Sequence, residues 1–244
     1  MTTAGTLHQA WYDLPFGRLD DIIGGGCCLV LAPHPDDESL GCGGLIAACC
    51  AAGRPPLVAI LTDGSQSHPG SRIYPPAALA ALREREARRA VGILGLPPAR
   101  LILLRQPDGA APHGGPVFDF LTERLARLAE HAGCSAVVAP WRCDPHCDHE
   151  AAFRLGARIA EAAGTGFVTY PVWGWVLSDD AVVDTYVEGG FRLDISPHRD
   201  AKRRAVAAHA SQYAGLITDD PAGFRLPLDL LRAADRPWET FLVP

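Results

Sequence analysis

Residues 27–38 read Cys-Cys-Leu-Val-Leu-Ala-Pro-His-Pro-Asp-Asp-Glu, an unbroken apolar run followed at once by an imidazole and three carboxyl groups. An apolar run without alternation is typical of a strand that is buried on both faces of a parallel sheet. Residues 39–52 are small and apolar and stop before Gly53, which predicts a helix. The opening stretch therefore predicts a strand, a polar turn and a helix.

The same alternation continues outward along the chain. Further strands are predicted at four short apolar runs, 57–61, 101–104, 135–139 and 167–170. Helices are predicted between and after them, at 76–94, 117–131 and 149–163. Strands that alternate with helices indicate an α/β fold, with a Rossmann-like, mostly parallel sheet covered by helices on both faces.

The pattern weakens beyond Pro171. Residues 172–187 are aromatic and β-branched and predict a hairpin or extra strands, and residues 199–211 predict a helix. Residues 218–244 predict an irregular C-terminal extension. We expect residues 1–244 to form a single domain whose motif-bearing core covers about residues 26–212.

Composition excludes several classes of protein. The 244 residues are 48% hydrophobic and 20% charged, which is typical of a globular chain, and the net charge is −6. An acidic balance disfavours a nucleic-acid partner. No apolar run approaches the roughly 18 residues of a membrane span, and the N-terminus does not look like a secretory leader. We therefore expect a soluble, cytoplasmic protein with mostly buried, reduced cysteines.

Imidazoles and carboxylates follow the predicted strands at the points where those strands end. In an open parallel sheet, the carboxyl ends of the strands meet at one edge, where ligands bind. We therefore expect these side chains to converge: His34, Asp36, Asp37, Asp108, Asp144, His146, Asp148 and His149.

His34, Asp37 and His149 offer two imidazoles and one carboxylate, a set that suits zinc and leaves a coordination position open for water. Asp36 lies beside Asp37 and is placed to act as a base on such a water. His146 is a candidate proton donor or oxyanion-polarising group. The same ligands accept iron(II), so the residues leave the native metal open.

Three further readings of these residues stay open. Asp144 and Asp148 are candidates to orient the histidines from behind. A rival set of zinc ligands is Cys143, Cys147 and His149, but this set would leave His34, Asp36 and Asp37 without a role. Carboxylates after a strand also serve simply as a favourable charge at a helix N-terminus.

The motif Ala32-Pro33-His34-Pro35-Asp36-Asp37-Glu38, followed by Gly43-Gly44, resembles the signature of the PIG-L/LmbE-like zinc de-N-acetylases. Asp144-Pro145-His146-Cys147-Asp148-His149, about 110 residues later, resembles the second metal motif of that family. The resemblance runs from about Gly26 to Gln212 and implies an LmbE-like fold. Two departures are Ser65, where the family often has Glu, and Cys147, where it often has Pro.

The resemblance also implies roles. His34, Asp37 and His149 would hold zinc, Asp36 would be the general base, and His146 would be the acid or electrophile. Substrate contacts would come from Arg83, in an Arg-x-x-Glu setting with Glu86, and from Asp108 on the sugar hydroxyls. Further positions match a family segment whose purpose the resemblance does not give: Lys202, His209, Ser211 and Gln212.

The implied activity is removal of an acetyl group from an N-acetylglucosamine-type sugar conjugate, a small molecule. A zinc amidase acting on a non-sugar N-acyl small molecule is the alternative, and a non-catalytic metal-binding module is a third reading. The group attached to the sugar and the oligomeric state, including a homo-oligomer, stay open. Tyr170, Trp173 and Trp175 could line a sugar-stacking wall or belong to the core. Gly41, Gly43 and Gly44 predict close helix–sheet packing rather than a nucleotide-binding loop.

Overall fold

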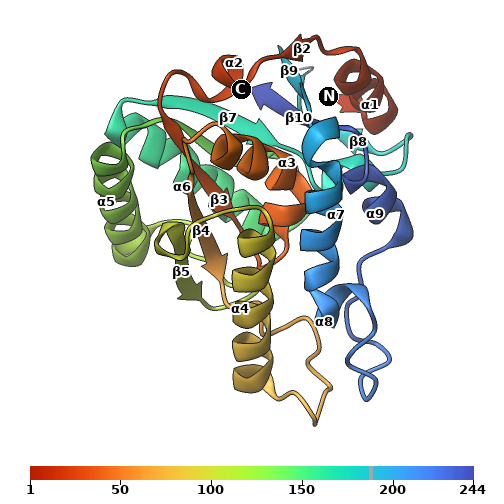
Figure 1. Ribbon diagram of the computed structural model, residues 1–244. Coiled ribbons are helices and arrows are strands. Elements are labelled where there is room, and N and C mark those ends of the chain that lie inside the picture. The colour runs from red at the N-terminus through yellow and green to blue at the C-terminus, as the bar shows by residue number, and fades with distance from the viewer. Residues whose placement is uncertain (187–188) are drawn as a thin grey trace.

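A computed structural model of the protein describes residues 1–186 and 189–244. The five predicted strands are confirmed, as β3 (Cys27–Ala32), β4 (Leu57–Thr62), β5 (Leu101–Gln106), β6 (Cys134–Pro140) and β7 (Gly166–Tyr170). They pair in parallel in the order β5, β4, β3, β6, β7 (Figure 1). The fold is mixed α/β with a mostly parallel sheet, as predicted.

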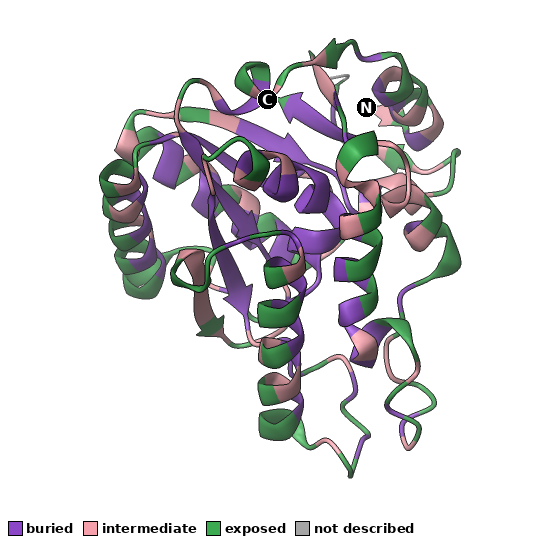
Figure 2. Ribbon diagram, viewed as in Figure 1, coloured by how far each residue is buried: buried purple, intermediate pink, exposed green. Residues whose placement is uncertain are grey.

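The predicted helices are also confirmed, as α3 (Asp37–Ala51), α4 (Pro76–Ile93), α5 (Gly115–Ala132) and α6 (Cys147–Ala163). One apolar cluster joins the sheet to α3, α4 and α7 (Arg199–Ala208), and another joins it to α5 and α6. Helices thus cover both faces, and Figure 2 shows the central strands β3, β4 and β6 as almost entirely buried, whereas the edge strand β5 is only partly buried.

The order of the strands places a switch point between β3 and β6. From β3 the chain moves outward through β4 to β5, and it then returns to the other side of β3 to form β6 and β7. The turn after β3 and the turn after β6 are therefore neighbours. A crevice at such a position is where open α/β sheets bind their ligands.

The C-terminal residues differ from expectation. Residues 218–244 contain α9 (Leu228–Ala234) and β10 (Trp238–Val243), and β10 is an interior strand, antiparallel to both β7 and β9 (Gly189–Asp194). The strand was missed because Glu239 is buried in it, where it accepts hydrogen bonds from the Lys202 ammonium and from two backbone N–H groups of α3. A buried ion pair removes the apolar pattern on which the prediction depended.

Residues 172–187 do not form a hairpin where the structure describes them. They contain a 3₁₀ helix, η2 (Trp173–Val176), and β8 (Val182–Val183), which pairs with β1 (Thr2–Thr3); Val187 lies outside the described residues. The helix predicted at 199–211 is interrupted at His209, where α7 gives way to α8 (Ala210–Tyr213).

The other described elements lie at the N-terminus and in connections. They are α1 (Ala4–Asp13), β2 (Phe16–Gly17), α2 (Leu19–Ile23), η1 (Pro98–Arg100) and η3 (Ser196–His198). Strand β2 pairs in parallel with β9 at the far edge of the sheet. No helix among the described residues is both long and apolar enough to span a membrane.

Glycines bring α3 close to the sheet, as predicted. A Cβ on Gly41 would lie 2.2 Å from Cδ2 of Tyr170 on β7, and one on Gly44 would lie 2.3 Å from Cγ2 of Ile195. The cysteines are mostly buried, as expected, and those in the described chain form no disulfide.

Candidate metal centre and active-site cleft

The turn between β3 and α3 holds Asp36 in an unusual backbone conformation. Its φ is 150°, a value that non-glycine residues rarely adopt. The N–H of Asp36 donates to Oε2 of Glu38 at 3.0 Å, and its carbonyl accepts from the N–H groups of Ser39 and Leu40. These bonds hold the strained residue at the start of α3, next to Asp37.

Asp37 lies between two histidines that come from different turns. Its Oδ2 is 3.1 Å from Nδ1 of His34, on the same turn, and 3.2 Å from Nε2 of His149, on α6. The three residues have ligand atoms close enough together to hold one metal ion. The first and second sequence motifs therefore meet in space, as predicted.

Carboxylates behind the two histidines orient their rings. Nδ1 of His149 is 3.0 Å from Oδ2 of Asp144, which also accepts from the N–H of Val172. Nε2 of His34 is 3.1 Å from Oδ2 of Asp148. A carboxylate behind an imidazole fixes the proton on the nitrogen that faces it, and this leaves the other nitrogen with a lone pair.

The ring nitrogens that do not face Asp144 or Asp148 are those that a metal would bind. Nε2 of His149 is fully buried and has no hydrogen-bond partner among the described residues, and it faces Asp37 together with Nδ1 of His34. A buried polar atom without a partner is costly, so it indicates a missing ligand. Two imidazole nitrogens and one carboxylate, each held from behind, fit a divalent ion such as zinc.

The charge state of the histidines is consistent with such a centre. Burial lowers the pKa of His149, but the carboxylates of Asp37 and Asp144 outweigh burial and raise it to about 9. Burial also lowers the pKa of His34, and its hydrogen bonds to Asp108 and other carboxylates raise it well above the usual value. The carboxylates thus favour positive charge at these two imidazoles, and a bound divalent cation would supply that charge in place of a proton.

Asp36 and Arg83 form a buried ion pair beside the trio. Oδ2 of Asp36 is 3.1 Å from Nη2 of Arg83, which comes from α4. The guanidinium also donates to the carbonyls of Pro35 and Gly64. Burial raises the pKa of Asp36 to about 6, although the positive charge of Arg83 lowers it.

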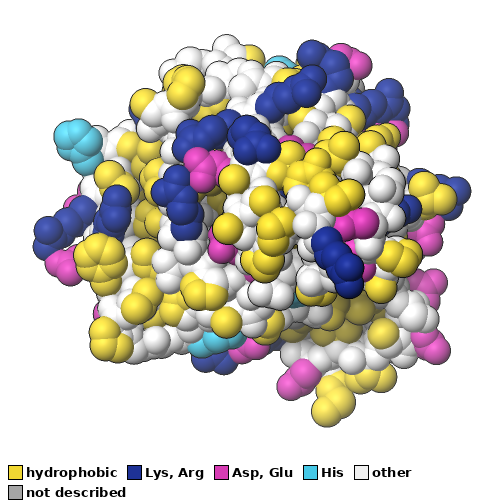
Figure 3. All heavy atoms as spheres, turned by 90° about the horizontal axis from the view of Figure 1, so that it is seen from below, with side chains coloured by type: hydrophobic (Ala, Val, Ile, Leu, Met, Phe, Trp, Pro, Cys, Tyr) yellow, Lys and Arg dark blue, Asp and Glu magenta, His cyan; other side chains and the backbone are white. Residues whose placement is uncertain are grey.

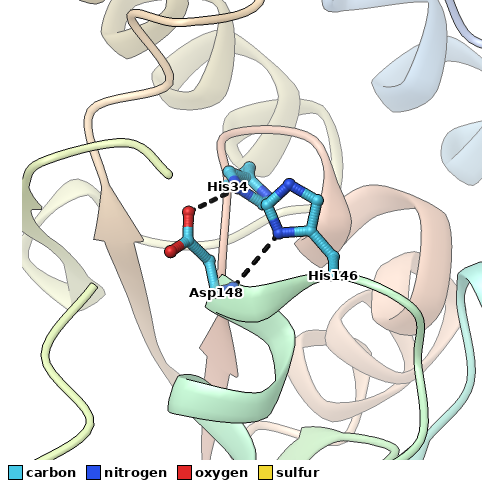
Figure 4. Close-up of side chains that lie close together, drawn as sticks. All are labelled: His34, His146 and Asp148. Atoms are coloured by element: carbon cyan, nitrogen blue, oxygen red, sulfur yellow. Dashed lines mark hydrogen bonds and ion pairs between the residues drawn. The ribbon is translucent and has the colours of Figure 1, made fainter. Parts of the chain in front are cut away.

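His146 is the N-cap of α6 and lies across the cleft. Its Nδ1 accepts from the N–H of Asp148 at 3.2 Å, so in the neutral ring the proton is on Nε2. Burial, with His34 and His149 nearby, lowers the pKa of His146 and favours that neutral ring. Figure 4 shows the rings of His34 and His146 next to each other, with a dashed line from Asp148 to each of them, and these three residues could also hold an ion.

Asp108 follows β5 and reaches the same place. One of its oxygens is 3.3 Å from Nε2 of His34, and the other accepts from the N–H of Gln66 at 2.7 Å. Asp148 is held similarly, by the N–H groups of Gly109 and Ala111. The loop after β5 is therefore bound to the centre through backbone donors.

A cleft of about 220 Å³ opens over these residues. Eight residues with polar side chains are part of its lining, namely His34, Asp36, Asp37, Gln66, Ser67, Arg83, Asp108 and His146. Of the three aromatic residues considered for a sugar wall, only Trp173 is part of the lining. The Tyr170 hydroxyl donates to Leu31 inside the core, and Trp175 packs against Trp11 and Arg236.

The contacts of the matched segment with the candidate site could not be found from the local sequence pattern. Glu38 is fully buried, and its Oε1 lies 3.0 Å from Nε2 of His209, which is also fully buried. Gln212 donates to the hydroxyl of Ser67 in the cleft, and Ser211 donates to Glu86. The matched segment after α7 thus reaches the turns that carry the candidate site.

The rival cysteine set is not brought together. Among the described residues, Cys143, Cys147 and His149 are not one of the groupings that could share an ion. Cys147 is exposed, and its thiol faces the carbonyl of Gly109 at 3.7 Å.

Comparison with known proteins gives concordant matches. A model of the family described as PIG-L, GlcNAc-PI de-N-acetylase, matches residues 29–160. A probable N-acetyl-α-D-glucosaminyl L-malate deacetylase 2 of Bacillus anthracis is 28% identical over 200 residues, which cover 78% of this chain and 83% of the relative. A diacetylchitobiose deacetylase of Thermococcus kodakarensis is 28% identical over 190 residues, which cover 76% of this chain and 69% of the relative. The solved structure of the conserved protein TT1542 of Thermus thermophilus is 26% identical, with a TM-score of 0.63 over 89% of this chain and 94% of that one.

Proposed function

This chain belongs to the PIG-L (GlcNAc-PI de-N-acetylase) family, and from that premise we propose that it is a metal-dependent N-deacetylase acting on an N-acetylglucosamine-type sugar conjugate. Both curated relatives are named as deacetylases of N-acetylglucosamine-containing molecules. The observation that carries the proposal is the meeting of two imidazole nitrogens on one oxygen of Asp37, where the three ligand atoms lie close enough together to share an ion.

His34, Asp37 and His149 are the residues that we propose as metal ligands, with Asp144 and Asp148 orienting the two histidines. Zinc is the metal that we propose, and iron(II) suits the same donors. Such an ion supplies a Lewis acid that lowers the pKa of water toward about 7 and polarises the amide carbonyl.

Asp36 is the proposed general base. It lines the cleft next to Asp37, and its carboxylate is held in place by Arg83. Its raised pKa, about 6, makes it a stronger proton acceptor than an exposed aspartate, while it stays mostly ionised at neutral pH. Asp36 would take a proton from the attacking water.

His146 is the proposed partner on the opposite side. Its Nδ1 is occupied by the N–H of Asp148, so the Nε2–H is the group left to donate to the amide. A neutral imidazole N–H stabilises negative charge that develops on a carbonyl oxygen. The proton that Asp36 collects can then pass to the leaving amine, which departs as the free amino sugar while acetate remains.

Asp108 is the proposed contact for sugar hydroxyls, because it lines the cleft. Burial raises the pKa of its carboxyl group, but the interactions with His34 outweigh burial and lower the pKa below its usual value. Arg83 also lines the cleft, and we propose that its main effect on the substrate runs through Asp36, which its guanidinium holds.

The experiment is a release assay with metal analysis. Purified protein is given N-acetylglucosamine glycosides and non-sugar N-acyl amides, and acetate and free amine are measured. We expect acetate from the glycosides, its loss after chelation and its return with zinc. Hydrolysis of the non-sugar amides alone would establish the alternative amidase activity. Metal binding with no hydrolysis of any compound would instead support a non-catalytic module.

A further inference from the structure

The cleft has a second, apolar wall that the proposed chemistry does not use. This wall is formed by Leu40, Trp173, Phe224 and Leu226. The rings of Trp173 and Phe224 meet edge to face, with centroids 5.8 Å apart, and both are partly exposed. Leu40 follows Asp36 by one helical turn, so the wall begins beside the proposed base.

Hydrogen bonds fix this wall in place. The N–H of Phe224 donates to the carbonyl of Ser67 at 2.7 Å, and the N–H of Gly70 donates to Asp220 at 2.8 Å. Asp219 accepts from the N–H groups of Arg72 and Ile73. The loop after β4 and the loop after α8 are thus joined into one unit, which lies at the lower end of the molecule in Figure 1. The face seen from below carries hydrophobic side chains among its charged ones (Figure 3).

The charged groups of the lining are already engaged with one another. Apart from the imidazoles, Arg83 is the cation among the described residues that line the cleft, and its Nη atoms are bound to Asp36, Pro35 and Gly64. Of the other carboxylates in the lining, Asp37 lies between His34 and His149, and Asp108 contacts His34. The charged part of the lining thus belongs to the proposed chemistry, which leaves the apolar wall to contact the rest of a substrate.

We propose that the group attached to the sugar packs an apolar face against Trp173 and Phe224. This inference rests on the proposed deacetylase function and names the substrate class for the same cleft. Rigid aromatic side chains in a preformed wall bind flat apolar faces at low entropic cost.

The test compares three α-glycosides of N-acetylglucosamine that share the reacting acetamide. They are the methyl glycoside, the phenyl glycoside and the L-malate conjugate, which bears two carboxylates. We expect kcat/KM for the phenyl glycoside to exceed that for the methyl glycoside by about two- to tenfold, the range of an aromatic contact. The malate conjugate, which offers no flat apolar face, should react more slowly than the phenyl glycoside.

Substitutions in the apolar wall test which residues cause the preference for the phenyl glycoside. Phe224→Ala and Trp173→Ala should each remove most of the preference for phenyl over methyl, measured as the ratio of the two kcat/KM values in the same variant, and Trp173→Phe should keep part of it. Phe120→Ala is the matched control, because Phe120 is exposed on α5, away from the cleft lining. It should change neither rate.

Four outcomes overturn the inference. Equal rates for the phenyl and methyl glycosides, or a malate conjugate that reacts fastest, would overturn the inference and leave the deacetylase function standing. Equal loss of all three activities in both alanine variants would show a purely structural role. Release of acetate from none of the three by the metal-loaded wild type would overturn the deacetylase function, and this inference with it.

Discussion

Asp36 and Arg83 form a buried ion pair, with Oδ2 of the carboxylate 3.1 Å from Nη2 of the guanidinium. The pair joins the turn after β3 to α4, and it holds in place a residue whose φ of 150° is unfavourable. Strain of this kind, of the order of 1–3 kcal/mol, persists only where surrounding contacts impose it, and it is concentrated at functional sites. The carboxylate next to the candidate metal centre is thus held in one orientation.

Asp36→Asn is expected to lower kcat by about 10²- to 10⁴-fold, because an amide cannot accept a proton from water at neutral pH. Asparagine tolerates unusual φ values nearly as well as aspartate, so the turn should survive. Acetate release, measured together with bound zinc per chain, checks the prediction. Asp194→Asn, at an exposed site, is the control and should keep full activity. Near-normal turnover by Asp36→Asn with zinc bound would exclude Asp36 as the base.

Glu38→Gln tests how Asp36 is held. The Glu38 carboxylate accepts from the Asp36 N–H and from the Ser39 hydroxyl, and it pairs with His209. An amide in its place presents an N–H₂ group to at least one of these donors. We expect kcat to fall while KM and zinc content change little, with a loss of stability of about 1–3 kcal/mol.

The matched control for Glu38→Gln is Glu86→Gln. Glu86 is also buried and accepts a backbone N–H and a hydroxyl, both from Ser211, but it does not touch Asp36. A similar loss of stability with kcat preserved is expected. If both variants lose kcat in proportion to their stability, Glu38 is only a structural residue.

Asp144→Asn addresses the orientation of the candidate ligand His149. Asp144 lies 3.0 Å from Nδ1 of His149 and also accepts from the N–H groups of Val172 and Gly174. Loss of a carboxylate behind a ligating imidazole typically weakens metal binding by about 10- to 100-fold. Competition with a chromophoric chelator measures this change. Unaltered zinc affinity in a folded variant would contradict the assignment of His149 as a ligand oriented by Asp144.

The sequence predicted the central strands well, because a strand buried on both faces leaves a continuous apolar run. It could not predict β10, whose buried Glu239 is explained by its contacts with Lys202 and with two backbone N–H groups of α3. The two metal motifs were recognisable because their residues are close together in the chain. The contact between Glu38 and His209 joins residues 171 positions apart, so no local sequence pattern predicts it. Phe224 was missed for the same reason, since its position in the cleft depends on the loop after β4.

Gly41→Ala tests the close approach of α3 to the sheet. The new Cβ would lie 2.2 Å from Cδ2 of Tyr170, and that ring cannot move freely because its hydroxyl donates to Leu31. We expect a loss of about 1–3 kcal/mol in the free energy of unfolding, measured by denaturant titration. Gly92→Ala is the matched control on α4, where nothing lies within 4 Å, and alanine should stabilise the helix by up to about 1 kcal/mol. Stabilisation by both substitutions would refute the proposed packing constraint.

Asp235→Asn is expected to reduce stability in a pH-dependent way. The Asp235 carboxylate, at the end of α9, pairs with Arg199 and Arg203 of α7. Its pKa is held below the usual value, mainly by its hydrogen bonds to Arg203. A lowered pKa means that the ionised form favours the folded state, so this contribution is fully present above the unfolded pKa, about 4, and is lost as the pH falls below it. The side chain is about one-third exposed, which limits the effect at pH 7 to a few tenths to about 1 kcal/mol. Thermal unfolding of wild type and variant between pH 7 and pH 3 should therefore show two curves that converge at the acidic end. Asp229→Asn, which removes only an exposed pair with Arg232, should follow the wild type throughout. A gap between wild type and Asp235→Asn that widens on acidification would show that the pair is not what joins α9 to α7.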